Sequence, residues 1–223
     1  TMEIKNKVIS FLGDSITEGV GASSVDKVWW KVLEKDTGII ARGYGVGGTR
    51  IARQQSASAN EKWDHDFNER MLGMDKDADI IGIFGGTNDY GHGDAPVGGI
   101  DDTTVDTFYG ALNHMYTYLI ETYPKAFIFV MTPLHRTNDT RNTGDGYKKP
   151  TLTLKGYVDA IKEVAEKYSL PVLDLYAIGG IYPENEINRN TWTVDGLHPN
   201  DAGYKKIAGM VQKFLENSYY EKN

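Results

Sequence analysis

Short apolar runs alternate along the chain with longer segments in which apolar residues recur at helical spacing. Each run is nearly continuous and rich in β-branched or aromatic residues, which is typical of strands buried on both faces of a parallel sheet. We predict strands at Val8–Leu12, Ile39–Tyr44, Ile80–Phe84, Phe127–Met131 and Val172–Leu175. Helical spacing predicts helices at Val28–Leu33, Phe108–Leu119, Leu154–Ala165 and Ile207–Leu215.

The alternation of these elements predicts a three-layer α/β/α fold. Its sheet would have five strands, mostly parallel and doubly wound, in the flavodoxin-like order 2-1-3-4-5. Asp102 or Thr103 is the expected N-cap of the helix that contains Phe108. No internal repeat or linker is visible, so we expect residues 1–223 to form a single domain.

Two polar stretches, Gln54–Asp79 and His135–Pro150, are too long for simple connections. Loops of that length are usually functional or disordered, and both interpretations stay open here. Arg136 and His135 leave the fourth strand and can either contact a polar substrate or belong to an ordinary charged loop. Trp192 can either line a pocket or pack on the last helix.

Composition narrows the function classes. The chain has no cysteine, which excludes disulfides, thiolate metal sites and a cysteine nucleophile. A net charge of −7 argues against nucleic acid and anionic membranes as partners. No apolar run has the roughly 18 residues that a membrane span needs. Thr1 precedes Met2, and if Met2 is the native start we expect a cytoplasmic protein; if a leader has been removed, the compartment is open.

Polar residues follow several of the predicted strands, where open α/β sheets bind their ligands. Gly13-Asp14-Ser15 comes directly after the first strand, and Ser15 is either a nucleophile or a helix N-cap. Asn88 follows the third strand and its glycine pair, as either an oxyanion donor or part of an Asx-turn. Asp195-Gly196-Leu197-His198 supplies a carboxylate and an imidazole in one turn, the two groups that general-base catalysis by histidine requires.

The glycines of Gly43–Gly48 fit the dinucleotide-binding pattern Gly-x-Gly-x-x-Gly letter for letter. They follow the second apolar run, however, and no further strand appears before Asp79. A glycine-rich turn whose N–H groups face a ligand fits the sequence better. The segment Asp89–Asp94 offers Asp and His at a spacing found in metal sites, but it lacks a third defined ligand and is glycine-rich, so a turn is the better interpretation.

Together, these segments resemble the SGNH (GDSL-type) hydrolase family. Gly13-Asp14-Ser15-Ile16, Gly45-Val46-Gly47-Gly48-Thr49, Gly86-Thr87-Asn88-Asp89 and Asp195-Gly196-Leu197-His198-Pro199 match its blocks in order. The resemblance implies a nucleophile at Ser15, an acid and a base at Asp195 and His198, and an oxyanion hole from Ser15, Gly48 and Asn88. It implies no cofactor and no metal. Gly43 stands where the family often has Asn, and Gly47 rivals Gly48 as donor.

The expected function is a serine esterase that cleaves a carboxylic ester with a small acyl group through an acyl-serine intermediate, with an acetylated carbohydrate as one candidate substrate. Within the family, a lysophospholipase or a thioesterase is the alternative. Outside it, the alternatives are a flavodoxin-like module that binds FMN or another phosphate ligand, and a metal-dependent phosphatase that uses Asp14 or the Asp89–Asp94 cluster. The expected partner is a small-molecule ester, and one sequence leaves the oligomeric state open.

Overall fold

The computed structural model describes residues 4–142, 144–145 and 152–219, and these contain one sheet of five strands. The strands are β1 (Val8–Gly13), β2 (Ile40–Gly45), β3 (Ile80–Phe84), β4 (Phe127–Met131) and β5 (Val172–Leu173). They lie in the order β2-β1-β3-β4-β5, and every neighbouring pair is parallel. The predicted α/β class and strand order are therefore confirmed.

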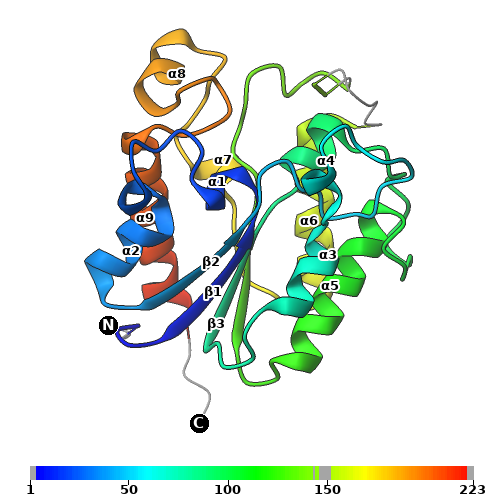
Figure 1. The fold of residues 1–223 in the computed structure, drawn as a ribbon, viewed down its shortest axis with the longest axis horizontal. Helices are drawn as coiled ribbons and strands as arrows, with labels where there is room; N and C mark the ends of the chain where they lie inside the picture. The colour runs from blue at the N-terminus through cyan, green and yellow to red at the C-terminus, as the bar shows by residue number, and fades with distance from the viewer. Residues whose placement is uncertain (1–3, 143, 146–151, 220–223) are drawn as a thin grey trace.

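Helices cover both faces of this sheet (Figure 1). On one face lie α2 (Trp29–Thr37) and α9 (Asp201–Ser218), and on the other α3 (Phe67–Arg70), α5 (Phe108–Thr122) and α6 (Leu154–Lys167). The remaining elements are α1 (Ser15–Glu18), α4 (Thr87–His92), α7 (Leu175–Ile178), α8 (Glu186–Trp192), and the 3₁₀ turns η1 (Val25–Lys27), η2 (Glu61–Asp64) and η3 (Met71–Gly73).

Two apolar clusters, one on each face of the sheet, hold the layers together. Trp29 of α2 packs with Val211 of α9 in one, and Met115 of α5 packs with Ile161 of α6 in the other. All four side chains are at most 1% exposed. Burial of each such side chain stabilises the fold by roughly 1.5–3 kcal/mol relative to exposure, so the sheet is a rigid base for the loops at its edge.

The predicted end of the fifth strand and the predicted N-cap of the helix at Phe108 are wrong because side-chain capping decides them. β5 ends at Leu173, since the carboxylate of Asp174 accepts the N–H of Ala177 at 3.2 Å and starts α7. The helix containing Phe108 begins only after Thr107, whose hydroxyl accepts the N–H of Gly110 at 3.0 Å. Asp102, one of the expected caps, instead accepts a hydrogen bond from the Thr107 hydroxyl at 2.8 Å.

The polar stretch 54–79 is an ordered part of the fold. It forms η2, α3 and η3, and it buries Phe67 and Met71 in the core while Leu72 stays 55% exposed. Of the second stretch, residues 143 and 146–150 lie outside the described residues. Within the described part of the chain, no helix combines the length and the apolar character needed to cross a membrane.

Candidate active site

Ser15 is positioned by the junction between β1 and α1. The strand ends at Gly13, and Asp14 caps the helix by accepting the N–H of Ile16 on its carboxylate at 3.0 Å. Ser15 is the first helical residue and is 7% exposed. An N-terminal helical residue has a backbone N–H with no partner inside the helix, so Ser15 can present both its hydroxyl and its N–H at the carboxyl edge of the sheet.

His198 and Asp195 lie in a closed turn at the same edge. The N–H of Val194 donates to the carbonyl of His198 at 2.9 Å, and Thr193 and Pro199 form an antiparallel bridge that closes the turn. Gly196 has a φ of +85°, a left-handed conformation that favours glycine. The turn is thus a small, separately braced loop directly before α9, and not an extension of a strand.

The turn places the imidazole between a hydroxyl and a carboxylate. Nε2 of His198 lies 3.0 Å from the hydroxyl oxygen of Ser15, and Nδ1 lies 2.6 Å from Oδ2 of Asp195. The other carboxylate oxygen of Asp195 accepts the backbone N–H groups of Leu197 and His198 at 2.9 and 2.7 Å. An ionised carboxylate accepts only, so the Nδ1 of His198 carries a proton and Nε2 faces the Ser15 hydroxyl.

Electrostatics keep this carboxylate charged. Partial burial alone would raise the pKa of Asp195, but hydrogen bonds from the His198 ring and from two backbone N–H groups outweigh it and lower the pKa to about 2. Asp195 therefore stays ionised at any pH at which the imidazole can act as a base. Its negative charge favours the imidazolium that would form when His198 takes a proton.

Asn88 brings a neutral amide to the same place. It lies in the first turn of α4, after the glycines that follow β3, and its Nδ2 donates to the carbonyl of Thr49 at 3.0 Å. That bond fixes the amide orientation and leaves the second Nδ2 hydrogen for a ligand. Gly47 and Gly48 lie opposite, in the turn after β2. The N–H of Gly47 donates to the carboxylate of Glu18 at 2.8 Å, which favours Gly48 over Gly47 as the free donor.

Comparison with models of protein families identifies the family of this chain. A model of the GDSL-like lipase/acylhydrolase family matches residues 11–206. The chain belongs to this family. A search of curated proteins finds no match.

Solved structures with the same fold extend over nearly the whole chain. A protein from Lactobacillus plantarum is 29% identical, with a TM-score of 0.82 over 97% of this chain and 100% of its own. A structure from Chitinophaga pinensis described as that of a possible lipase is 22% identical, with a TM-score of 0.69 over 94% and 97%. A carbohydrate acetylesterase family member from Sinorhizobium meliloti is 16% identical, with a TM-score of 0.61 over 94% and 97%. The GDSL-like family supports hydrolysis of esters as the general activity of this chain.

In this family member, Ser15, Gly48, Asn88 and His198 line a cavity of about 440 Å³. Its lining comprises Ser15, Glu18, Val20, Gly47, Gly48, Asn60, Lys62, Trp63, Asn88, His92, Asp145, Leu197 and His198. The lining mixes a tryptophan ring and a few aliphatic groups with side chains of both charges. Such a cavity has room for a small acyl group and for part of a polar alcohol.

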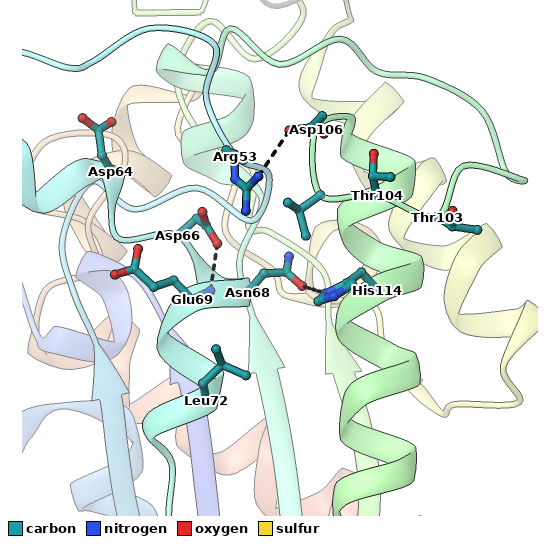
Figure 2. Close-up of a pocket in the computed structure, with 11 residues that line it drawn as sticks. Arg53, Asp64, Asp66, Asn68, Glu69, Leu72, Thr103, Thr104, Asp106 and His114 are labelled. Carbon is teal, nitrogen blue, oxygen red and sulfur yellow. Dashed lines mark hydrogen bonds and ion pairs between the residues drawn. The ribbon is translucent and has the colours of Figure 1, made fainter.

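A larger cavity of about 680 Å³ lies away from these groups, between α3 and α5 (Figure 2). Its polar side chains largely bond to their own neighbours. Asp66 accepts the N–H of Glu69, Nδ1 of His114 lies 2.9 Å from Oδ1 of Asn68, and Arg53 points toward Asp106 (Figure 2). Size alone would favour this cavity, but its lining contains neither Ser15 nor His198, and its own imidazole, that of His114, has no serine beside it in the lining.

Sequence reasoning missed the residues that brace the site from behind. The guanidinium of Arg70 donates to the carbonyls of Gly13 and Tyr44 at 2.8 and 2.9 Å and to the hydroxyl of Thr49 at 2.9 Å. It thereby joins the end of β1, which carries Ser15, to the turn that carries Gly48. Burial lowers the pKa of Arg70 to about 10, which still leaves the side chain charged. In the sequence, only the polar character of the long stretch 54–79 indicated that this segment contributes to the site.

A second buried arginine holds the cavity wall. Arg50 is fully buried, and it donates to Nδ1 of His92 at 2.6 Å, to the Ser58 hydroxyl at 2.8 Å and to Asp64 at 2.7 Å. An arginine cannot accept, so Nδ1 of His92 is the acceptor and the ring proton lies on Nε2. The ring of Trp63 packs at 4.6 Å from the His92 ring.

Asp89 anchors the same region by accepting the N–H groups of Ile51 and Ala52 at 2.9 and 3.1 Å. Burial raises the pKa of this carboxyl to about 7 even though the two hydrogen bonds oppose the shift. Asp94 accepts from Gln55 and Ser56. Asp89, His92 and Asp94 thus bond to separate protein groups, and no cluster suited to a metal occurs within the described ranges.

Other sequence alternatives are also decided by contacts. Trp192 packs against the core on the α9 side, and the Lys206 ammonium lies 4.1 Å from its ring centre. Arg136 is buried and donates to the carbonyl and hydroxyl of Thr87 at 3.2 Å each. His135 stacks on Tyr176 with ring centres 3.7 Å apart. None of the three lines the cavity next to Ser15.

Two glycine positions of the second block have a local explanation. A Cβ on Gly43 would lie 2.3 Å from the ring of Trp30, so a side chain there cannot coexist with that indole. The Nε1–H of Trp30, in α2, donates to the carbonyl of Thr17 at 2.7 Å and links α2 to α1. The Trp30 ring thus packs on β2 at the position where the family often has Asn. The carboxylate of Glu18 accepts the N–H of Gly47 in this glycine-rich turn. A phosphate bound at the turn would be repelled by that negative charge, which disfavours a phosphate ligand there.

Proposed function

We propose that this GDSL-like acylhydrolase cleaves a carboxylic ester with a small acyl group through an acyl intermediate on Ser15. The observation that carries the proposal is the continuous hydrogen-bonded series from the Ser15 hydroxyl through His198 to Asp195, at 3.0 and 2.6 Å. A serine hydroxyl is a poor nucleophile until a neighbouring base removes its proton. Nε2 of His198 is the base within reach.

In the first half-reaction, Ser15 Oγ attacks the ester carbonyl carbon while Nε2 of His198 accepts the hydroxyl proton. The carbonyl oxygen becomes an oxyanion, held by the backbone N–H groups of Ser15 and Gly48 and by Nδ2 of Asn88. Within the described ranges, neither backbone N–H donates to another protein group. His198 then gives its proton to the leaving alcohol oxygen, and the acyl-serine ester remains.

In the second half-reaction, water attacks the acyl carbon while His198 accepts one of its protons. The same three donors hold the second oxyanion. When the carbon–Oγ bond breaks, the proton returns to Ser15 and the carboxylic acid leaves. Asp195 stays ionised throughout and stabilises the imidazolium in both steps.

The cavity supports a small acyl group joined to a polar alcohol. Its volume is about 440 Å³, and Asn60 and Lys62 give it hydrogen-bonding side chains of two kinds. Acetylated carbohydrates fit this description. One structural relative carries the name of a carbohydrate acetylesterase family member, although its 16% identity speaks only for a common fold. Long acyl chains, as in lysophospholipids, would need an extended apolar surface that this lining does not provide.

A fluorophosphonate probe followed by peptide mass spectrometry tests the mechanism. We expect the adduct on Ser15, and loss of labelling together with a roughly million-fold loss of turnover in Ser15→Ala, as for other serine nucleophiles. Ser23→Ala is the matched control, because the Ser23 hydroxyl bonds to Asp201 on the surface. Full esterase activity in Ser15→Ala would refute the proposal.

A panel of esters tests the substrate. One series lengthens the acyl chain on a constant p-nitrophenol, and a second compares acetate esters of sugars, of apolar alcohols and of a thiol. We expect kcat/KM to be highest for acetate and for the sugar alcohols. A maximum at long acyl chains would favour a lysophospholipase, and a maximum for the thioester would favour a thioesterase.

A further inference from the structure

Glu18 reaches from the helix of the proposed nucleophile to the turn of the proposed oxyanion hole. It is the last residue of α1, three positions after Ser15, and its Oε2 accepts the N–H of Gly47 at 2.8 Å. Residues three apart in a helix lie on the same side. Glu18 and Ser15 accordingly line the same cavity as Gly47 and Gly48. Neither the catalytic steps above nor the family match gives this carboxylate a role.

The turn and α1 fit together too tightly for this contact to be incidental. A Cβ on Gly45 would lie 2.2 Å from the backbone nitrogen of Glu18. A Cβ on Gly47 would lie 2.7 Å from Oε2 of Glu18 and 3.5 Å from Cβ of Ser15. The backbone of the turn thus lies directly against the helix that carries the nucleophile. Its position relative to Ser15 is set by these contacts.

The opposite side of the turn is closed by an aromatic ring. A Cβ on Gly48 would lie 2.1 Å from the indole of Trp63, and Gly48 has a φ of +75°. The peptide unit between Gly47 and Gly48 therefore lies between the Glu18 carboxylate and the Trp63 ring. The N–H groups of the two glycines differ: that of Gly47 is bound to Glu18, whereas that of Gly48, a residue that lines the cavity, has no protein partner among the described residues.

We propose that Glu18 is a positioning residue that determines which backbone N–H serves as oxyanion donor. By holding the N–H of Gly47, the carboxylate fixes the turn in the conformation that presents the N–H of Gly48 beside Asn88. The inference rests on the proposed serine-hydrolase function. It assigns Glu18 no proton transfer and no contact with the reacting carbon.

The role requires a hydrogen-bond acceptor and does not require a charge. A negative charge beside a developing oxyanion is unfavourable, so the hydrogen bond and the charge of Glu18 act in opposite directions on the transition state. Glu18→Gln keeps an acceptor oxygen and removes the charge. Glu18→Ala removes both.

A matched control exists elsewhere in the chain. Glu34 of α2 accepts the N–H of Ala41 on Oε2, also at 2.8 Å, at a site remote from Ser15. Glu34→Ala therefore removes the same type of bond at the same length. It reports what the loss of such a bond does to stability without touching the turn at Gly47 and Gly48.

The experiment measures kcat and KM with p-nitrophenyl acetate for the three variants, together with inhibition by a boronic acid that forms a tetrahedral adduct with the serine. For Glu18→Ala we expect kcat to fall about tenfold, less than the 10²–10³ that complete removal of an oxyanion donor costs, with KM nearly unchanged. The boronic acid should bind more weakly by a similar factor. Glu18→Gln and Glu34→Ala should stay within about threefold of the unmodified protein.

The outcomes separate the possible explanations. Unchanged kcat in Glu18→Ala overturns the inference, and so does a Glu18→Gln variant as slow as Glu18→Ala, because the charge would then be the active feature. If kcat falls as much in Glu34→Ala as in Glu18→Ala, a general loss of stability would explain both results, and the inference would be overturned. If fluorophosphonate fails to label Ser15 in the unmodified protein, the proposed function fails as a whole. If Ser15 is labelled normally but the Glu18 variants have the same kcat as the unmodified protein, only this inference fails.

Discussion

Removal of the Asn88 amide is the most direct test of how the site stabilises an oxyanion. One Nδ2 hydrogen is used by the carbonyl of Thr49 at 3.0 Å, and the other is available to the substrate. Asn88→Ala should thus have two separable effects. Loss of the oxyanion donor should lower kcat by about 10²–10³, or roughly 2.7–4 kcal/mol of transition-state stabilisation. Loss of the bond to Thr49 should cost about 0.5–1.5 kcal/mol of folding free energy.

Asn113 provides the control for the second effect. It is 3% exposed, its Nδ2 donates to the carbonyls of Ile100 and Asp102 at 2.8 Å each, and it does not line the cavity beside Ser15. Asn113→Ala should therefore destabilise the fold at least as much as Asn88→Ala. Its kcat should be unchanged at temperatures where the protein is folded.

The assay combines steady-state hydrolysis of p-nitrophenyl acetate with urea unfolding of the same preparations. Fluorophosphonate titration of active sites corrects kcat for the fraction of competent protein. The reasoning is refuted if folded Asn88→Ala keeps kcat within about threefold, because a donor to the transition state cannot be removed at so small a cost. It is also refuted if the Asn113 variant loses as much turnover, since stability alone would then explain both results.

Three further substitutions test neighbouring parts of the argument. Asp195→Asn should lower kcat by up to about 10⁴, because the neutral amide no longer holds the His198 tautomer, and full activity by p-nitrophenyl acetate assay would contradict this. Asp89→Asn tests the buried carboxyl whose pKa is raised to about 7. Because burial disfavours the ionised form, the Asp89 carboxyl contributes most to the free energy of unfolding below pH 4. That contribution is lost as the pH rises through 7. Urea unfolding should hence show that the substitution costs more at pH 5 than at pH 8, and the opposite trend would exclude the buried carboxyl as the cause. Gly48→Ala should lower both the unfolding temperature and kcat, because the added Cβ collides with Trp63 at a positive φ, and a calorimetric scan with unchanged midpoint would argue against that collision.

The sequence predicted the fold and the polar groups at the sheet edge because both depend on local patterns. Buried parallel strands read as apolar runs, and Ser15 and Asn88 follow such runs directly. The Asp195–His198 pair was visible because both partners lie in one turn. Helix starts were less predictable: Thr107 and Asp102 are both good caps, and only the packed structure decides which of them is used.

The bracing residues escaped prediction for a different reason. Arg70, Arg50 and Glu18 act through contacts between segments that are distant in sequence, and their side-chain types are common on any surface. Arg70 lies 57 positions from Gly13, whose carbonyl it binds. A pattern of apolar and polar residues cannot distinguish such an arginine from a solvated one. Only burial and hydrogen bonding identify it.

The turn that carries Asp195 and His198 also has a consequence for inactivation. It is held by its own bridge and by a hydrogen bond from the N–H of Thr137 to the carbonyl of Gly196, outside the ladder of the sheet, and the Asp195 side chain is 49% exposed. Segments of this kind open locally at a lower free energy than the core. Because the proposed acid and base, Asp195 and His198, lie on one such segment, a single local opening would withdraw both from Ser15 at once. A low concentration of denaturant should therefore abolish ester hydrolysis while the sheet and its helices are still folded.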